Sequence, residues 1–277
     1  MRRYSWRTFT RELVLLAVAA FFCIPFYILF ILSVKPGSDL FTNALNFPTH
    51  PSFHNYSDVW NQKGQISMGK AMLNSLIITA GTVTCLIVIG SLCAYTIARR
   101  RSRLSTSLYF LFVLGIIVPF QLGIVPLYVA FRNLGLVGSY IGMIILWVGI
   151  ATPVSVFLYT GFMRALPADY EEAARVDGAS TLRMFVRVVF PLLRPVTATV
   201  AILTGLFVWN DFFVSLIYLG GSTRQTLPVS IYSFVGEYST QWNLVFAAIV
   251  IALLPVMLFF VFAQRKLIEG FSGGIRG

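Results

Sequence analysis

Charged residues are scarce in this 277-residue chain, and their scarcity decides which class of protein it is. Asp, Glu, Lys and Arg together make up 11% of the residues, whereas hydrophobic residues make up 57%. A soluble domain carries about 25% charged residues. The mean hydropathy of +0.81 agrees with this deficit of charge. The composition therefore excludes an ordinary soluble protein and predicts an integral membrane protein in contact with membrane lipid.

Cysteine and histidine are also rare, with three and two residues respectively. Cys85 and Cys93 lie eight residues apart on one predicted helix, a separation of about 12 Å at about 1.5 Å per residue, which is too long for a disulfide. His50 and His54 are four residues apart, a spacing that suits a metal pair on a helix. Pro51 lies between them and argues against a helix, so we expect neither a disulfide framework nor a metal site.

Nucleotide-binding and catalytic motifs are missing as well. The sequence has no G-x-x-x-x-G-K-[ST] loop, whose backbone N–H groups would hold phosphates. No Ser/His/Asp, Cys/His or paired-carboxylate set falls within the apolar segments. We therefore expect no catalysis and no cofactor on this chain, and any ATP and Mg²⁺ must bind to a separate chain.

Long apolar segments are what the sequence does contain. Each of six is close to the roughly 20 residues that a helix needs to span a bilayer. The first could be a signal peptide, because Ala17-Val18-Ala19 offers a cleavage site, but it continues past that point and is interpreted as a retained span. The predicted fold is an all-α membrane protein with six transmembrane helices, at about residues 13–34, 71–98, 107–131, 138–162, 196–219 and 243–263.

The basic residues predict the orientation of these spans. If the amino terminus is cytoplasmic, 16 of the 21 Lys and Arg residues fall in inner segments and 5 in outer loops. Cytoplasmic enrichment in Lys and Arg is the rule that sets membrane orientation. The net charge of +11 therefore reflects topology, with both termini cytoplasmic, and it does not indicate nucleic-acid binding.

The longest charged interval runs from Arg164 to Pro195 and lies between the fourth and fifth predicted spans. Pro167 suits the first turn of a helix, where its missing N–H costs little. Gly178 should end this helix, because glycine readily takes the left-handed conformation found at helix ends. Negative charge is favoured at the positive end of the helix, where three acids lie: Asp169, Glu171 and Glu172.

A second short helix should follow the Asp-Gly bend. Ser180 can cap its start, and two prolines, Pro191 and Pro195, should bring it to an end. Two short helices joined by a tight bend form a rigid projection, which is a shape suited to pressing on a partner.

These residues resemble the EAA loop of binding-protein-dependent ABC importer permeases. The similarity covers about 24 positions, more than a lone short motif would. It rests on Glu172-Ala173-Ala174, Asp177-Gly178-Ala179, Phe185, Val188, Pro191 and Pro195. In that family the loop forms the coupling helix, which docks into a cleft on a cytoplasmic ATPase. The alternative is an amphipathic helix pair at the membrane surface that has no partner. The resemblance assigns ATPase coupling to Glu171, Glu172, Ala173, Ala174, Asp177, Gly178 and Ala179.

The end of the chain, Glu269–Gly277, is similar to the carboxyl terminus of the second permease subunit of maltose-type sugar importers. In those relatives the tail reaches toward the ATPase dimer. The resemblance implies a single permease domain over residues 1–277 in the cytoplasmic membrane of a bacterium or archaeon. It also implies three partners: a second homologous permease subunit, an ATPase homodimer and an extracytoplasmic solute-binding protein.

Asp211 is the one acid predicted deep within a span. A charge there costs about 2.5–3.5 kcal/mol on insertion scales, so such residues usually face a bundle interior or water. We expect Trp209, Asn210 and Asp211, together with Gln121, to line a translocation pathway, where indole can stack on a sugar and the polar groups can bind hydroxyls. Asp211 could instead fix two helices to each other, or lie closer to the membrane surface.

Prolines interrupt the third predicted span at Pro119 and Pro126. Backbone groups that proline leaves free must be satisfied by neighbouring helices or water, so such breaks line a cavity or form a static kink. The sequence alone leaves both possibilities open.

The predicted function is a permease subunit that imports a sugar or oligosaccharide by ATP-driven alternating access. One alternative is the same importer type carrying a glycerol phosphate ester, a polyol or another solute. No predicted span carries a deep Lys or Arg, which disfavours a phosphate ester. A non-transporting membrane scaffold or sensor is the remaining alternative.

Overall fold

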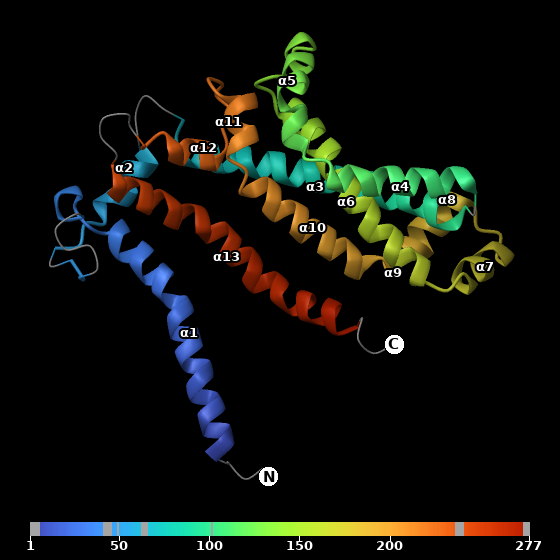
Figure 1. Ribbon diagram of the computed structural model, residues 1–277, viewed down its shortest axis with the longest axis horizontal. Helices are drawn as coiled ribbons and strands as arrows, with labels where there is room; N and C mark the ends of the chain where they lie inside the picture. The colour runs from blue at the N-terminus through green and yellow to red at the C-terminus, as the bar shows by residue number, and fades with distance from the viewer. Residues whose placement is uncertain are drawn as a thin grey trace. The chain divides into compact units, whose positions relative to one another are not determined.

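The computed structural model describes residues 6–40, 46–48, 50–61, 66–100, 102–235 and 241–273. Regular structure in these residues consists of helices, with no β-strand among them (Figure 1). This confirms the predicted all-α class. A helix satisfies its backbone hydrogen bonds within one segment, as a chain in lipid requires.

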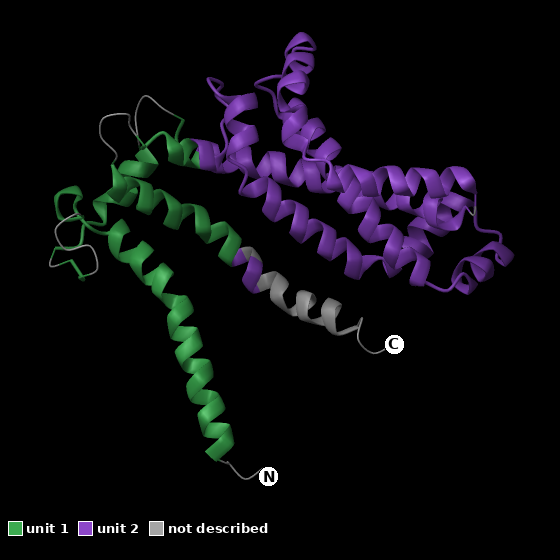
Figure 2. Ribbon diagram, viewed as in Figure 1, with its two compact units in different colours: residues 1–69, 230–257 green, residues 70–229, 258–277 purple. Residues whose placement is uncertain are grey.

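The chain divides into two compact units, shown in Figure 2. One unit contains Met1–Gly69 and Ser230–Met257, and the other contains Lys70–Val229 and Leu258–Gly277. The single permease domain expected over residues 1–277 remains a prediction.

The first unit contains α1 (Trp6–Ser33), the short 3-10 turn η1 (Gly37–Asp39), α2 (His54–Asn61) and the first part of α13 (Trp242–Gly273). Asn55 links three of its segments. The Asn55 amide donates to the backbone oxygens of Ser33 and Lys35, at 2.8 and 2.9 Å. The Asn243 amide donates to Asn55 Oδ1 at 3.0 Å, so one buried side chain joins the end of α1 to the start of α13.

The second unit holds the remaining helices, and serine side chains cap two of them. Ser102 Oγ accepts from Ser105 N at the start of α4, and Ser139 Oγ accepts from Gly142 N at the start of α6. The helices of this unit, in chain order, are α3 (Met68–Arg99, which begins in the first unit), α4 (Arg103–Ile117), η2 (Phe120–Gly123), α5 (Ile124–Asn133), α6 (Tyr140–Ala165), α7 (Asp169–Val176), α8 (Thr181–Met184), the π-helical η3 (Phe185–Val189), α9 (Phe190–Leu192), α10 (Arg194–Trp209), α11 (Phe213–Leu219) and α12 (Leu227–Tyr232, which ends in the first unit).

Close approach of α3 and α6 depends on Gly90. A Cβ added to this glycine would overlap Ser155 Oγ and crowd Ser155 Cβ at 3.1 Å, so a larger residue would require Ser155 or the helices to shift. Small residues at helix contacts are typical of membrane bundles. Ser155 Oγ also donates to the Leu86 carbonyl oxygen at 3.3 Å across this contact.

Membrane-spanning capacity follows the predicted segments only in part. In the described part of the chain, three helices, α1, α3 and α6, are long and apolar enough to cross a membrane by themselves, and two bent helix pairs raise the number to as many as five. A shorter apolar stretch, Trp242–Leu258, begins α13. Several apolar helices are therefore present, and the count of six remains a prediction.

Two predicted spans are broken helices. Residues 107–131 were expected as one span, but Arg103–Ile117 and Phe120–Asn133 meet at 88°. Val118 adopts an extended backbone before Pro119, as the residue before proline prefers, and this ends α4. Residues 196–219 are interrupted between Trp209 and Phe213, where α10 ends and α11 begins.

Candidate functional site

The first helix of the charged interval ends as the sequence predicts. Gly178 has a φ of 76°, in the left-handed region. Its N–H donates to the Arg175 carbonyl oxygen at 3.1 Å, and the Ala179 N–H donates to the Ala174 carbonyl oxygen at 3.0 Å. These two bonds form a Schellman motif, which satisfies carbonyl groups at the helix end. The bend at Asp177-Gly178 is confirmed.

The second helix differs from the prediction at both ends. Ser180 occupies the capping position, but its side chain makes no capping hydrogen bond. Pro191 lies inside helical structure, because α9 continues directly from the π-helical η3. Pro195 likewise begins α10 instead of ending a helix. The break lies at Leu193, and the helices on either side meet at 74°.

Pro167 also lies outside the predicted position. It precedes Ala168, which caps α7, so the proline stands in the connection from α6 and not in the first helical turn. The acids Asp169, Glu171 and Glu172 do occupy the first turn of α7, as expected from the helix dipole.

Glu171 joins the charged interval to α3. Its Oε1 accepts from Arg99 Nε at 2.6 Å, and its Oε2 accepts from the Tyr95 hydroxyl at 3.1 Å. Arg99 also donates to the Leu166 carbonyl oxygen at 3.4 Å, in the connection that leads into α7. The Glu171 side chain is only 8% exposed, so this carboxylate is buried against a cation and a hydroxyl.

Apolar packing supports the second half of the interval. Phe185, Val189 and Leu193 recur every four residues and are buried in one cluster. The Phe185 ring centroid lies 5.1 Å from that of Tyr95, which also hydrogen-bonds Glu171. The cluster is completed by side chains from α3, α6 and α10: Ala94, Tyr159, Met163, Val196 and Val200. The short helices are therefore fixed onto the longer ones by an ion pair and an apolar core.

The opposite side of these short helices is exposed. Among the residues assigned to coupling, Glu172, Ala173, Asp177 and Gly178 are exposed, and Ala174 and Ala179 are half-buried. Large apolar side chains are exposed beside them, with Val176 at 88%. Exposed apolar side chains grouped in sequence with polar ones are typical of protein interaction surfaces. We call this set the coupling surface: Tyr170, Glu172, Ala173, Val176, Asp177 and Leu182.

The structure places Asp211 in the break between α10 and α11, where it caps α11. Its Oδ1 accepts from Val214 N at 3.1 Å, and its Oδ2 accepts from Ser215 N and Ser215 Oγ, both at 2.8 Å. Asn210 is exposed and its amide donates to the Leu206 carbonyl oxygen at 2.8 Å, whereas Trp209 is half-buried. The carboxylate thus caps the helix that follows it, a local role that differs from the contact between two helices offered by the sequence as an alternative.

Gln121 lies in the other break, in the exposed turn η2. Within the described residues, no hydrogen bond joins Gln121 to the Trp209–Asp211 segment. The residues beside the two breaks do share one apolar cluster, because Ile124 and Val214 both belong to it. The Tyr218 hydroxyl also donates to the Ile124 carbonyl oxygen at 3.1 Å, joining α11 to α5.

Trp147 is a residue of this cluster that sequence reasoning missed. It is buried, and its indole N–H has no hydrogen-bond partner among the described residues. Its ring packs edge-on against Phe207, with centroids 5.3 Å apart, and tilted against Phe120 at 6.3 Å. An aromatic residue with a polar group in the middle of a predicted span was the available signal.

The carboxyl-terminal stretch that carries a family resemblance runs past Gly273, so its last residues lie outside the described part of the chain. In the described ranges, no group of three or more His, Cys, Asp or Glu side chains could hold a metal ion.

Comparison with known proteins identifies relatives over nearly the whole chain. Residues 86–272 match the family described as binding-protein-dependent transport system inner membrane component. The chain is 38% identical to the melibiose/raffinose/stachyose import permease protein MelC of Bacillus subtilis, over 99% of this chain and 97% of that protein. It is 33% identical to the probable starch degradation products transport system permease protein AmyC of Thermoanaerobacterium thermosulfurigenes, over 90% of each.

A solved structure has a similar fold. It is the crystal structure of a bacterial ABC transporter involved in the import of the acidic polysaccharide alginate, and the TM-score is 0.79 at 22% sequence identity. The match covers 96% of this chain and 99% of the other.

Proposed function

The chain belongs to the family of binding-protein-dependent transport system inner membrane components, and we propose that it imports a sugar or oligosaccharide as one permease subunit of an ABC importer. The chain is a membrane protein and a transport subunit, and ATP is hydrolysed by a separate ATPase chain. The observation that carries the proposal is the pair of short helices α7 and α8. Glu171 of α7 binds Arg99 of α3 on one side, and the other side of the pair is exposed.

The proposed partners follow from this arrangement. A second, similar permease subunit would complete the pathway, a dimer of ATPase chains would bind the coupling surface, and an extracytoplasmic solute-binding protein would deliver the substrate. Six spans with both termini cytoplasmic would place α7 and α8 on the same side as the ATPase. The chain would then reside in the cytoplasmic membrane of a bacterium or archaeon.

Coupling is proposed to proceed through both sides of α7. Val176, Glu172 and their exposed neighbours contact the ATPase, and closure of the ATPase dimer on ATP moves them. Glu171 is too buried to offer a docking surface, so we assign it to anchoring: it passes the movement of α7 to Arg99 at the end of α3. Alternating access results when this movement tilts the long helices.

The pathway is proposed to run beside the two helix breaks. Breaks expose backbone groups, which are tolerated in a membrane where they border a water-filled cavity. Trp209, Asn210 and Gln121 would present stacking and hydrogen-bonding groups there. A carboxylate has about four acceptor sites, and Asp211 uses three of them in capping α11, which leaves one for a substrate hydroxyl.

Uptake by cells tests this proposal directly. A host that lacks its own uptake of raffinose should accumulate radiolabelled raffinose or a related oligosaccharide when it expresses this chain with its partner subunits. Competition by unlabelled glycans would then define the substrate. Accumulation of a polyol or a glycerol phosphate ester, with no glycan transported, would support the alternative importer.

A further inference from the structure

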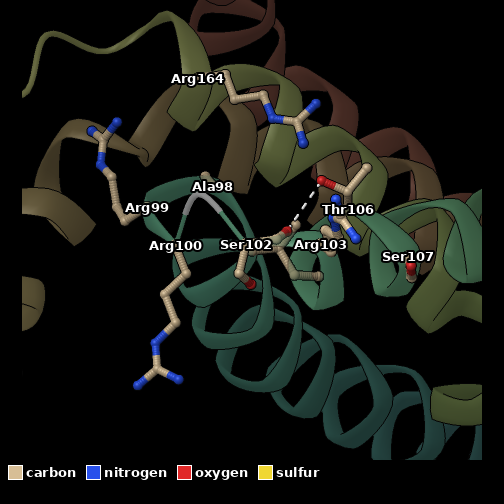
Figure 3. Close-up of a pocket in the computed structure, with 9 residues that line it drawn as sticks. Ala98, Arg99, Arg100, Ser102, Arg103, Thr106, Ser107 and Arg164 are labelled. Carbon is tan, nitrogen blue, oxygen red and sulfur yellow. Dashed lines mark hydrogen bonds between the residues drawn. The ribbon is translucent and has the colours of Figure 1, made fainter.

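A hollow lined by arginines lies where α3, α4 and α6 come together. Its volume is about 720 Å³, and Figure 3 shows the side chains that surround it. Three polar residues at the start of α4, Ser102, Thr106 and Ser107, contribute hydroxyl groups, and no acid lines the hollow. Four of the nine lining residues are arginines: Arg99, Arg100, Arg103 and Arg164.

Two of these arginines are committed to contacts within the protein. Arg99 pairs with Glu171, and the Arg164 guanidinium lies 4.4 Å from the centre of the Tyr109 ring. The side chains of Arg100 and Arg103 make no hydrogen bond or ion pair with any described residue, and both are exposed. The Arg103 guanidinium is therefore free to bind an anion in the hollow, and the Arg100 side chain, which points away from Arg103 and Arg164 in Figure 3, adds positive charge at its rim.

The surroundings indicate which anion would fit. Guanidinium groups bind phosphate oxygens through paired hydrogen bonds. The outer face of α4 beside the hollow is apolar, with Leu104 70% exposed and Leu111 62% exposed. An occupant with a phosphate group and acyl chains would satisfy both the arginines and these leucines. Basic pockets between helices at the cytoplasmic side of a membrane are where anionic headgroups bind.

We propose that this arginine hollow binds the phosphate group of an anion, supplied by the headgroup of an anionic phospholipid. The inference rests on the cytoplasmic placement proposed above for this end of α3. The hollow lies next to the ion pair between Arg99 and Glu171, because Arg99 both lines the hollow and donates to Glu171. Lipid bound there would hold the end of α3 beside the coupling helices.

Lipid binding to the purified complex provides the test. The full chain, purified in detergent with its partner subunits, is titrated with phosphatidylglycerol and examined by native mass spectrometry, with phosphatidylcholine as the neutral comparison. Because R100Q/R103Q removes the charge-assisted hydrogen bonds that these guanidinium groups can donate to phosphate, it should weaken phosphatidylglycerol binding at least about tenfold.

Two control variants separate a site from general charge. R7Q/R11Q removes two exposed charges at α1 and should leave phosphatidylglycerol binding unchanged. R100K/R103K keeps the positive charge that sets orientation but loses the paired guanidinium hydrogen bonds, so it should weaken phosphatidylglycerol binding, whereas full retention would assign the binding to charge alone. Equal loss in R100Q/R103Q and R7Q/R11Q would overturn the proposal and leave these arginines as orientation signals alone.

Inorganic phosphate distinguishes the source of the anion. Lipid binding that persists in excess inorganic phosphate supports a phospholipid site, whereas displacement by phosphate, lost in R100Q/R103Q, supports a site for soluble phosphate compounds. If neither phosphatidylglycerol nor phosphate distinguishes wild type from R100Q/R103Q, the hollow is not an anion site. None of these measurements depends on transport, so they can fail independently of the proposed function.

Discussion

Arg99 and Glu171 form an ion pair, with 2.6 Å between Nε and Oε1, that joins the last turn of α3 to the first turn of α7. The pair connects a long apolar helix to the short helix that carries the EAA residues. Tyr95, one turn earlier on α3, binds the other carboxylate oxygen. A movement of α7 therefore cannot leave the end of α3 in place without breaking these bonds.

Loss of the anchor should uncouple ATP hydrolysis from transport. A hydrogen bond to a charged group contributes about 1.5–3 kcal/mol, and Glu171→Ala removes the acceptor of two such bonds. We expect a lower Tm for the purified complex and reduced transport per ATP hydrolysed, measured in proteoliposomes. Glu172→Ala, at the exposed neighbouring position, should leave the Tm unchanged and weaken ATPase association. Wild-type coupling in Glu171→Ala would contradict the anchoring role.

The bend at Gly178 should not tolerate a β-branched residue. Its φ of 76° is strongly disfavoured for such side chains, and strain of this kind costs about 1–3 kcal/mol. Nothing lies within 4 Å of an added Cβ, so the cost comes from the backbone and not from a clash. Gly178→Val should therefore reduce co-purification of the ATPase chain. Gly161→Ala in α6, which also has open space around it, serves as the control and should bind the ATPase normally.

Asp211 combines a capping role with a proposed pathway role, and two substitutions separate them. Asp211→Ala removes the cap and should destabilise the complex by about 1 kcal/mol. Asp211→Asn loses the charge but keeps one oxygen that can accept from the α11 N–H groups, so we expect a Tm between those of wild type and Asp211→Ala, and transport about tenfold lower, measured as initial uptake rate. Unchanged uptake by Asp211→Asn would contradict the pathway role and leave Asp211 with the capping role alone.

Membrane orientation can be tested at two exposed positions. In a variant without the three native cysteines, Val176→Cys on α7 should react with a membrane-impermeant maleimide only in inside-out vesicles. Thr223→Cys, in the loop after α11, should react only from the opposite side. Labelling of both positions from one side would contradict the proposed six-span topology.

Features with a local cause could be predicted from the sequence. The left-handed bend at Gly178 follows from an Asp-Gly pair after an acidic helical turn, and the long apolar helices follow from runs of hydrophobic residues. Features that depend on packing could not. Pro191 and Pro195 were expected to end a helix, yet a π-helical turn that buries Phe185 and Val189 carries the chain through Pro191. The break instead falls at Leu193, which is buried in the same cluster.

In the candidate site too, the features that depend on packing could not be predicted from the sequence. Glu171 and Glu172 are adjacent in sequence and chemically alike, and only their positions on α7 distinguish a buried anchor from an exposed contact. Arg99 lies 72 residues away from Glu171, and no periodicity in the sequence pairs them. Asp211 appeared to lie deep in a span because the break after Trp209 has no proline or glycine to mark it.

Coupled ATP hydrolysis tests the central claim most directly. The complex is reconstituted in liposomes with its solute-binding protein, and hydrolysis is measured against a panel of oligosaccharides, polyols and glycerol phosphate esters. The account predicts that one class of glycan stimulates hydrolysis and that Glu171→Ala lowers the amount of glycan transported per ATP. Hydrolysis stimulated only by a polyol or a phosphate ester would contradict the carbohydrate assignment, and a chain that never associates with an ATPase would contradict the importer function itself.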